Sequence, residues 1–514
     1  MKKNILRSVS FAAAAALLAA VPAGAQAFHN FVGVGDSLIA GEESGCVVQR
    51  FEQRSWVAIV ADRLGQSDFE QPSIQELPAT HPLTGYPCLG LTFNGTSLSI
   101  TIVSETGQNT NLLLPRPYNN LGFNGSPLMA DFVDLTVTHP GPGAPDLDNL
   151  AAPILRNCEG CPFQGMSAVD EANLLNPDLV AFWGGNNDVL NALFAGVAIV
   201  GVTITPVDSF TTSANQVMAG LSASGRTVVS GNIPNAIDIP YATTIPPVVV
   251  DPATMQPVVV NGSLVPLLGP GDAAYPCTPA PPCGLPPGSL VMLPASQLIA
   301  TGYGLPTAVC PPGLPNCGQP LPHGTFVPPA TLNVGVILYP DDVATIESTI
   351  VAYNQAIASA ISANGAVPID SNAIFAEVSK NGYDIGGIHL TAAYGTGGIF
   401  SYDGVHPSAI GYGIIADFFI KTLNAAKGTS IPPPNFSDIL FTPNVPDVGG
   451  AALTSDGGPW HYSLDTWRAA LGAAFSPRLA VVMPAVPRAS APVVPHRPTP
   501  RSVRTLDRDH AARD

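Results

Sequence analysis

Near its start the chain reads Phe31-Val32-Gly33-Val34-Gly35-Asp36-Ser37-Leu38. The apolar run 31–34 is typical of a buried strand, and 55–64 is typical of a helix capped by Ser55, because its apolar residues recur at helical spacing. A serine between a strand and a helix is open to substrate, and backbone N–H groups of the turn can reach an oxyanion formed beside it. We therefore expect an α/β protein with a reactive Ser37 after its first strand.

The alternation of strand and helix returns further along the chain. Apolar runs and amphipathic patterns predict strands at 179–183, 226–230 and 367–370, and helices beginning near Pro206, over 341–363 and over 408–426. Such alternation is typical of a parallel, doubly wound sheet, whose ligands gather at the carboxyl ends of the strands.

Three polar motifs follow Ser37 in order. They are Asn120-Leu121-Gly122-Phe123-Asn124-Gly125, Gly185-Asn186-Asn187-Asp188 and Asp403-Gly404-Val405-His406-Pro407. Serine is a weak nucleophile and needs a base to take its proton. His406 is the predicted base, and Asp403, three residues before it, can approach the imidazole Nδ1 while Nε2 faces Ser37.

This set of motifs resembles the GDSL or SGNH hydrolase family. The resemblance implies a three-layer α/β/α sandwich over 28–426, with Ser37 as nucleophile, His406 as base and Asp403 as third member of the triad. It also implies an oxyanion hole made by the backbone N–H groups of Ser37 and Gly125 and by the side-chain amide of Asn187.

Each of these residues has a structural alternative. Ser37 and Asn187 could cap the helices that follow them, Gly125 could be a turn residue, and His406 could simply precede a turn stopped by proline. The gap from Ser37 to Gly125 is long, and Gly122 could take the place of Gly125 in the oxyanion hole.

Five other polar residues stand near the motifs. Asp36 is expected to order its loop by hydrogen bonds, Asp188 to be structural, and His389 to be a core or loop residue. Glu42 and Glu43 could be acids near the site, and we expect them to be solvated.

Other catalytic designs are not found in the sequence. The chain lacks G-x-S-x-G, a Walker loop, H-E-x-x-H and a calcium loop. Cys158 and Cys161 form a C-x-x-C pair without two further zinc ligands nearby. We expect no cofactor and no metal ion.

Composition points to long loops around the core, because the chain has 54 Pro and 50 Gly among its 514 residues. We predict an inserted hairpin region over 66–119, with an exposed strand at 98–103 followed by a turn at Gly107. We also predict a Pro- and Cys-rich insertion or lid over 241–335, too rich in proline for helices or central strands. A surface decoration without catalytic role is the alternative for this second insertion.

The first 27 residues are typical of a signal peptide, with a basic start, an apolar run and small residues before a cleavage site. We expect a secreted or periplasmic protein, cell-surface associated or free, with no membrane-spanning segment in the mature chain.

Its eight cysteines favour disulfides, and clustering suggests the pairs 158–161, 277–283, 310–317 and 46–88 among 105 connectivities. After 426 we expect an extension over 427–476 and a disordered Pro- and Arg-rich tail over 477–514.

The net charge of −17 makes nucleic acid and anionic surfaces poor partners. We expect a secreted serine hydrolase, a lipase or esterase, that cleaves carboxylic esters through an acyl-serine. Its partner would be a small-molecule or lipid ester, in the latter case met at a lipid interface. An acyltransferase using the same acyl-enzyme, or a secreted binding protein without turnover, are the alternatives.

Overall fold

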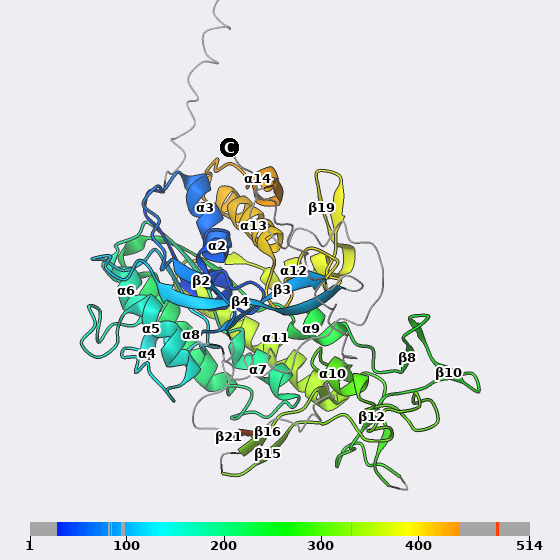
Figure 1. Cartoon of the computed structure of the whole chain (residues 1–514). Helices are drawn as coiled ribbons and strands as arrows, with labels where there is room; N and C mark the ends of the chain where they lie inside the picture. Colours follow the sequence, from blue (N-terminus) through cyan, green and yellow to red (C-terminus); the bar gives the residue numbers. More distant parts are fainter. Residues whose placement is uncertain are drawn as a thin grey trace, which may run out of the picture. The chain divides into compact units, whose positions relative to one another are not determined.

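In the computed structural model, described positions run from Phe28 to Val482 (Figure 1). The structure describes residues 28–80, 83, 85–93, 98–278, 280–329, 331–441 and 480–482. The predicted signal peptide, 1–27, lies outside these residues, as do 442–479 and 483–514.

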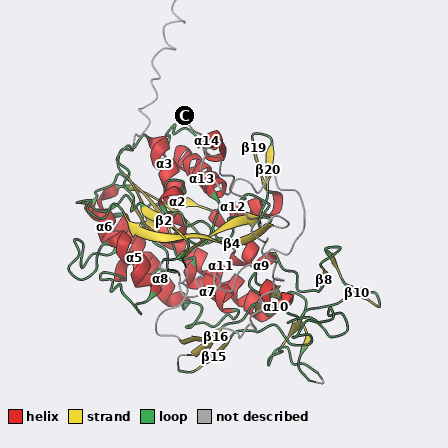
Figure 2. Ribbon diagram, in the orientation of Figure 1, coloured by secondary structure: helices red, strands yellow, loops and turns green. Residues whose placement is uncertain are grey.

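The core is a mixed α/β structure around a five-stranded parallel sheet (Figure 2). In sheet order the strands are β18 (Val367–Ile369), β7 (Thr227–Gly231), β6 (Leu179–Trp183), β1 (Phe31–Gly35) and β5 (Asn120–Gly122). Four of them were predicted within a residue or two. The edge strand β5 was not, because its three residues contain no apolar run.

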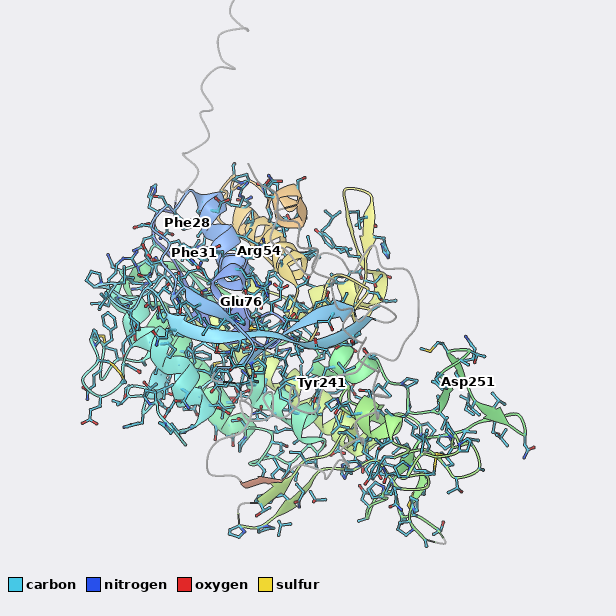
Figure 3. The ribbon with its side chains drawn as sticks, viewed as in Figure 1. Phe28, Phe31, Arg54, Glu76, Tyr241 and Asp251 are labelled. Atoms are coloured by element: carbon cyan, nitrogen blue, oxygen red, sulfur yellow. A yellow bond between two sulfur atoms is a disulfide. The ribbon has the colours of Figure 1, made fainter. Side chains whose placement is uncertain are left out.

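Apolar residues of the sheet are covered on one face by α3 (Trp56–Leu64) and α13 (Ala409–Lys427), which pack against each other. Ser55 caps α3 as predicted, its Oγ accepting a hydrogen bond from the Ala58 N–H. Phe28 and Phe31, labelled in Figure 3, belong to the buried cluster beneath these helices. Trp56 and Trp183 meet edge to face in the same cluster. Burial of this many large apolar side chains provides the main stabilisation of the sheet.

Two long helices lie on the other side of the sheet, α8 (Val207–Leu221) and α11 (Pro340–Ala363) (Figure 1). Phe210 of α8 stacks on Tyr353 of α11, with ring centroids 3.8 Å apart. Other described helices of this body are α1 (Ser37–Ala40), α2 (Gln49–Glu52), α4 (Asp131–Asp134), α5 (Asp146–Leu155), α6 (Ala168–Leu174), α7 (Asn187–Ala195) and α12 (Ser371–Asn381). The predicted helices near Pro206, over 341–363 and over 408–426 are confirmed.

The inserted region 66–119 forms a three-stranded antiparallel sheet in the order β2 (Ile74–Pro78), β4 (Leu98–Asn109) and β3 (Pro87–Phe93). The predicted strand at 98–103 is thus longer, and Gly107 lies within it rather than in a turn. The strand continues because β2 pairs with this half of β4, Glu76 opposite Thr106 and Leu77 opposite Glu105.

The Pro-rich insertion 241–335 consists mainly of loops and short strand pairs, found at labels β8, β10 and β12 in Figure 1. Its described pairs are β8 (Val250–Asp251) with β9 (Gln256–Pro257), β10 (Val259–Val260) with β11 (Ser263–Leu264), β12 (Leu268–Gly269) with β13 (Cys283–Gly284), and β15 (Thr325–Val327) with β16 (Thr331–Asn333). A fifth pair joins β14 (Leu290–Val291) to β17 (Ile337–Leu338), just beyond the insertion.

The expectation of no helix in this insertion is wrong in two places. Helix α9 (Pro240–Thr243) spans its start, and α10 (Ala295–Ala300) lies inside it. Proline stands at the first position of α9, where its missing N–H costs no hydrogen bond. The sequence 295–300 contains no proline, so a short helix can form there.

Beyond the core come the hairpin β19 (Tyr383–Ile385) and β20 (Ile388–Leu390), and after α13 the helix α14 (Phe436–Phe441). The rest of the predicted 427–476 extension after residue 441 lies outside the described residues. Within the predicted tail 477–514, only β21 (Ala480–Val482) is described, and it pairs in parallel with β16. These residues are an apolar, β-branched run in an otherwise Pro- and Arg-rich segment.

The four predicted disulfides are confirmed: Cys46–Cys88, Cys158–Cys161, Cys277–Cys283 and Cys310–Cys317. Disulfides of this number are typical of proteins that fold in an oxidising compartment. Among the described helices, none is both long and apolar enough to cross a membrane.

Candidate active site

Ser37 is the first residue of α1 (Ser37–Ala40), immediately past the carboxyl end of β1. Asp36, and not Ser37, caps this helix: its carboxylate accepts hydrogen bonds from the Leu38 N–H at 3.0 Å and from Asn186 Nδ2 at 2.7 Å. Gly35 is required here because a Cβ would collide with the Trp183 carbonyl oxygen. The cap leaves the Ser37 hydroxyl available for other partners, and Asp36 orders the loop as predicted.

The imidazole of His406 lies between Ser37 and Asp403. His406 Nε2 is 2.8 Å from Ser37 Oγ, and His406 Nδ1 is 2.8 Å from Asp403 Oδ2. His406 belongs to the loop before α13 and lies 369 positions after Ser37 in the chain. The structure therefore brings together the three residues that the sequence predicted as a triad, in the predicted orientation of the ring.

The Asp403 carboxylate is buried and held by several donors. Its Oδ1 accepts hydrogen bonds from the backbone N–H groups of Val405 and His406, each at 2.8 Å, and from Ser401 Oγ at 3.2 Å. Its Oδ2 also accepts one from the Gly45 N–H at 2.8 Å. Because its oxygens are engaged on several sides, the carboxylate is fixed in place and remains ionised next to the imidazole.

Glu42 is a member of the site that the sequence analysis placed in solvent, and this expectation is wrong. Its Oε2 lies 3.8 Å from His406 Nε2, and its side chain is only 13% exposed. Glu43 is buried as well, at 1%. The loop folds inward because the Cys46–Cys88 disulfide ties it to β3 and a hydrogen bond from the Tyr412 hydroxyl to the Glu42 carbonyl ties it to α13.

The carboxylates set the charge state of His406. Burial alone would lower the pKa of His406, but the negative charges of Glu42, Asp403 and Asp36 outweigh it and raise this pKa to about 9. Burial would raise the pKa of Asp403, yet the imidazole and the backbone N–H groups hold it below its usual value. Burial raises the pKa of Glu42, and it raises that of Asp36 to about 6.

Asn187 lies beside Ser37 in the pocket described below and is 5% exposed. Its Nδ2 donates a hydrogen bond to the Pro127 carbonyl at 3.2 Å, which leaves the second amide hydrogen for another acceptor. The residue is the first of helix α7, whose cap position is occupied by Asn186, so the alternative of Asn187 as a helix cap is not what the structure shows.

Gly125 follows β5 in a loop that runs beside the Ser37 turn. The Phe123 N–H donates to the Gly35 carbonyl, so 123–125 passes next to the end of β1. Gly125 has a φ of +89° and lies against Leu147 of α5, where a Cβ would come within 2.9 Å of the Leu147 Cα. Gly122, the other candidate donor, gives its N–H to the Asn120 side chain at 3.0 Å and is thus occupied.

A pocket of about 60 Å³ opens next to Ser37 and His406. Its remaining lining is mainly apolar: Leu38, Leu190, Ile233, Pro234, Ala236, Ile239, Phe375 and Val405, with Asp36, Asn186 and Asn187 as polar members. Most of these residues follow the carboxyl ends of β1, β6 and β7, which is where ligands bind in parallel sheets.

Asp188 and His389 were also singled out in the sequence, and neither belongs to the triad. Asp188 is buried and accepts a hydrogen bond from the Met129 N–H at 2.8 Å, in the structural role expected. The expectation that His389 is a core or loop residue is wrong, because it is exposed in strand β20, where its Nδ1 lies 2.9 Å from Asp384 Oδ1. Glu42, Asp403 and His406 each offer one possible metal-ligating atom, and these three atoms lie within 4.8 Å of one another. Among the described residues, this is the group whose spacing would suit a metal ion.

Comparison with protein-family models, with curated proteins and with solved structures found no match to this chain. Glu42 is the site residue that sequence reasoning missed; its position five residues after Ser37 and close to Cys46 was the signal that could have found it.

Proposed function

We propose that the protein is a serine hydrolase that cleaves carboxylic esters, with the α/β/α sandwich and site of the SGNH type. The observation that carries this proposal is the hydrogen-bonded chain from Asp403 through His406 to Ser37, with 2.8 Å at both links. Nucleophile, base and orienting carboxylate in this order are what acyl transfer through serine requires.

The reaction begins when Ser37 Oγ attacks the ester carbonyl carbon and its proton passes to His406 Nε2. The oxyanion that forms is stabilised by the Ser37 and Gly125 N–H groups and by the free amide hydrogen of Asn187. Asp403 keeps the proton on Nδ1, so that Nε2 can act as the base, and stabilises the imidazolium once it has formed.

Collapse of the tetrahedral intermediate breaks the bond to the alcohol oxygen, which takes the proton from His406 Nε2 and leaves as the free alcohol. A water molecule then gives a proton to His406 and attacks the acyl-serine carbonyl carbon. The carboxylic acid departs as Ser37 recovers its proton from the imidazolium. No cofactor enters this sequence of steps.

Export from the cytoplasm is part of the proposal. The four disulfides support it, together with the signal-like residues 1–27. The protein would then work in the periplasm or outside the cell.

A fluorophosphonate probe tests the proposal independently of the substrate. The probe reacts with activated serines, so the account predicts one covalent adduct, located by mass spectrometry on the peptide that contains Ser37. Ser222→Ala is a control outside the site that should keep the adduct, whereas His406→Ala should lose it. A wild-type protein that stays unlabelled would favour the binding-protein alternative.

Ester turnover with and without added alcohol separates hydrolase from acyltransferase, since a hydrolase releases mainly free acid.

A further inference from the structure

A second and larger cavity lies between the inserted sheet and α5. Its volume is about 410 Å³, within the range of pockets that bind small molecules. Residues of β2 and β4 form one side, residues of α5 form the other, and Asn124 stands on the wall between them.

This cavity is linked to the candidate active site through Asn124. Burial raises the pKa of Glu42, and hydrogen bonding by the Asn124 side chain acts against this rise, so the two side chains are neighbours. Glu42 Oε2 in turn is 3.8 Å from His406 Nε2. Leu150, on the α5 wall of the cavity, also lies against Gly125. The first connection leads to His406, whose Nε2 contacts the Ser37 hydroxyl, and the second leads to Gly125, the proposed oxyanion donor.

The position of the cavity relative to His406 decides whether it could bind the acyl part or the alcohol part of an ester. The alcohol oxygen must receive its proton from His406 Nε2 as it leaves, so the alcohol departs on the side of this nitrogen. Glu42 stands on that side, and Asn124, on the cavity wall, is the neighbour of Glu42. The smaller, mainly apolar pocket of about 60 Å³ then remains for the acyl group.

The lining indicates the chemistry of the occupant. Among the described residues, none that lines the cavity is charged. Gln108 presents its amide there, and Thr106 Oγ1 accepts a hydrogen bond from the Tyr86 N–H, which leaves the hydroxyl hydrogen to donate. Leu77, Leu150 and Ile154 contribute apolar surface. Neutral hydrogen-bonding groups beside apolar ones suit hydroxyl-bearing rings or chains. They provide no positive charge to pair with a phosphate.

We propose that this cavity is the leaving-group subsite of the hydrolase, and that it takes an uncharged, hydroxyl-bearing alcohol of the sugar or polyol class. The inference rests on the proposed function and adds its substrate class: a small acyl group on a large neutral alcohol. It also gives the inserted sheet of residues 66–119 a role in binding.

Two variants test the subsite. Leu77→Trp fills the cavity from a position that is already 37% exposed, and its folding is checked by circular dichroism. Gln108→Leu removes the amide at similar size. Leu113→Trp is the matched control, because Leu113 is 96% exposed outside the cavity. The substrates are methyl acetate and an acetylated methyl glucoside, with kcat/KM measured from acid release by the full mature chain.

The wild type should prefer the acetylated glucoside by about tenfold or more, since pocket contacts of this size discriminate substrates by such factors. Leu77→Trp should abolish the preference while methyl acetate is cleaved as before, Gln108→Leu should reduce it, and Leu113→Trp should keep it. Equal kcat/KM for both esters, or a change common to both in Leu77→Trp, would overturn the inference.

A binding measurement separates this inference from the proposed function. Methyl glucoside is added to Ser37→Ala and its contact with the protein is followed by saturation-transfer NMR. Binding that Leu77→Trp removes supports the subsite even before turnover is measured. If methyl glucoside binds but the wild type hydrolyses no ester, both the leaving-group role of the cavity and the proposed esterase activity are overturned. If methyl glucoside does not bind to Ser37→Ala, the subsite alone is overturned.

Discussion

The backbone N–H of Gly45 donates a 2.8 Å hydrogen bond to Asp403 Oδ2, the oxygen that also faces His406 Nδ1. The two residues are 358 positions apart. Gly45 precedes Cys46, whose disulfide to Cys88 anchors the loop to β3 of the inserted sheet. The insertion thus reaches the orienting carboxylate through one covalent bond and one hydrogen bond.

Removing this disulfide should cost both stability and activity. For a separation of 42 residues, loop-closure entropy gives a loss of about 4 kcal/mol in Cys46→Ala/Cys88→Ala, measured by denaturant unfolding. Cys310→Ala/Cys317→Ala, with a separation of 7, should lose about 2.5 kcal/mol and keep its kcat. Unchanged kcat in the first variant would show that the loop does not position Asp403.

Asp403→Asn should reduce kcat by about 10³- to 10⁴-fold, because an amide cannot stabilise the imidazolium and favours the wrong tautomer. The backbone donors at Val405, His406 and Gly45 also require an acceptor, so the variant should be less stable. Asp384→Asn, beside the exposed His389, is the control and should change neither quantity. A loss below tenfold would mean that another group orients His406.

The pH profile should report the raised pKa of His406. The base must be neutral to take the Ser37 proton, so kcat/KM should increase with pH up to about 9, the pKa of His406. The negative charge of Glu42 is the largest single cause that raises this pKa, followed by the charge of Asp403, the hydrogen bond to Asp403 and the charge of Asp36.

Glu42→Gln removes that negative charge, lowers the pKa of His406 and moves the acidic limb of the profile to lower pH, with a higher rate at pH 7. If the acidic limb of the pH profile does not move in Glu42→Gln, the charge of Glu42 does not affect the pKa of His406. Lower activity at all pH values would show a structural role instead.

Asn187→Ala should lower kcat by about 10²- to 10³-fold with little change in KM, as expected when one oxyanion donor is lost. Asn191→Ala makes the same change one turn further along α7, outside the pocket, and should leave kcat intact. Equal effects of both substitutions would point to damage of the helix.

The sequence predicts those parts of the fold that depend on apolar patterning. Strand β6 at 179–183 and helix α13 were predicted because their apolar residues form the core, and His406 was predicted from its spacing to Asp403. Strand β5 was missed because Asn120-Leu121-Gly122 has no apolar pattern and is defined by its pairing with β1.

Glu42 shows that the burial of a charged side chain could not be predicted from the sequence. Its residue type predicts a solvated side chain, and only the fold of the loop against Tyr412 and Asn124 buries it. The closed contact between Gly45 and Asp403 is likewise a property of the tertiary structure, since no local pattern links two residues so distant in the chain.

The most direct measurement is hydrolysis of p-nitrophenyl esters from acetate to palmitate by the wild type and by Ser37→Ala. The account predicts turnover by the wild type, fastest with the short acyl chains that the small pocket admits, and a loss of about 10⁴-fold or more in Ser37→Ala with unchanged folding. Equal rates in the two proteins, or no turnover of any ester by a folded wild type, would contradict it.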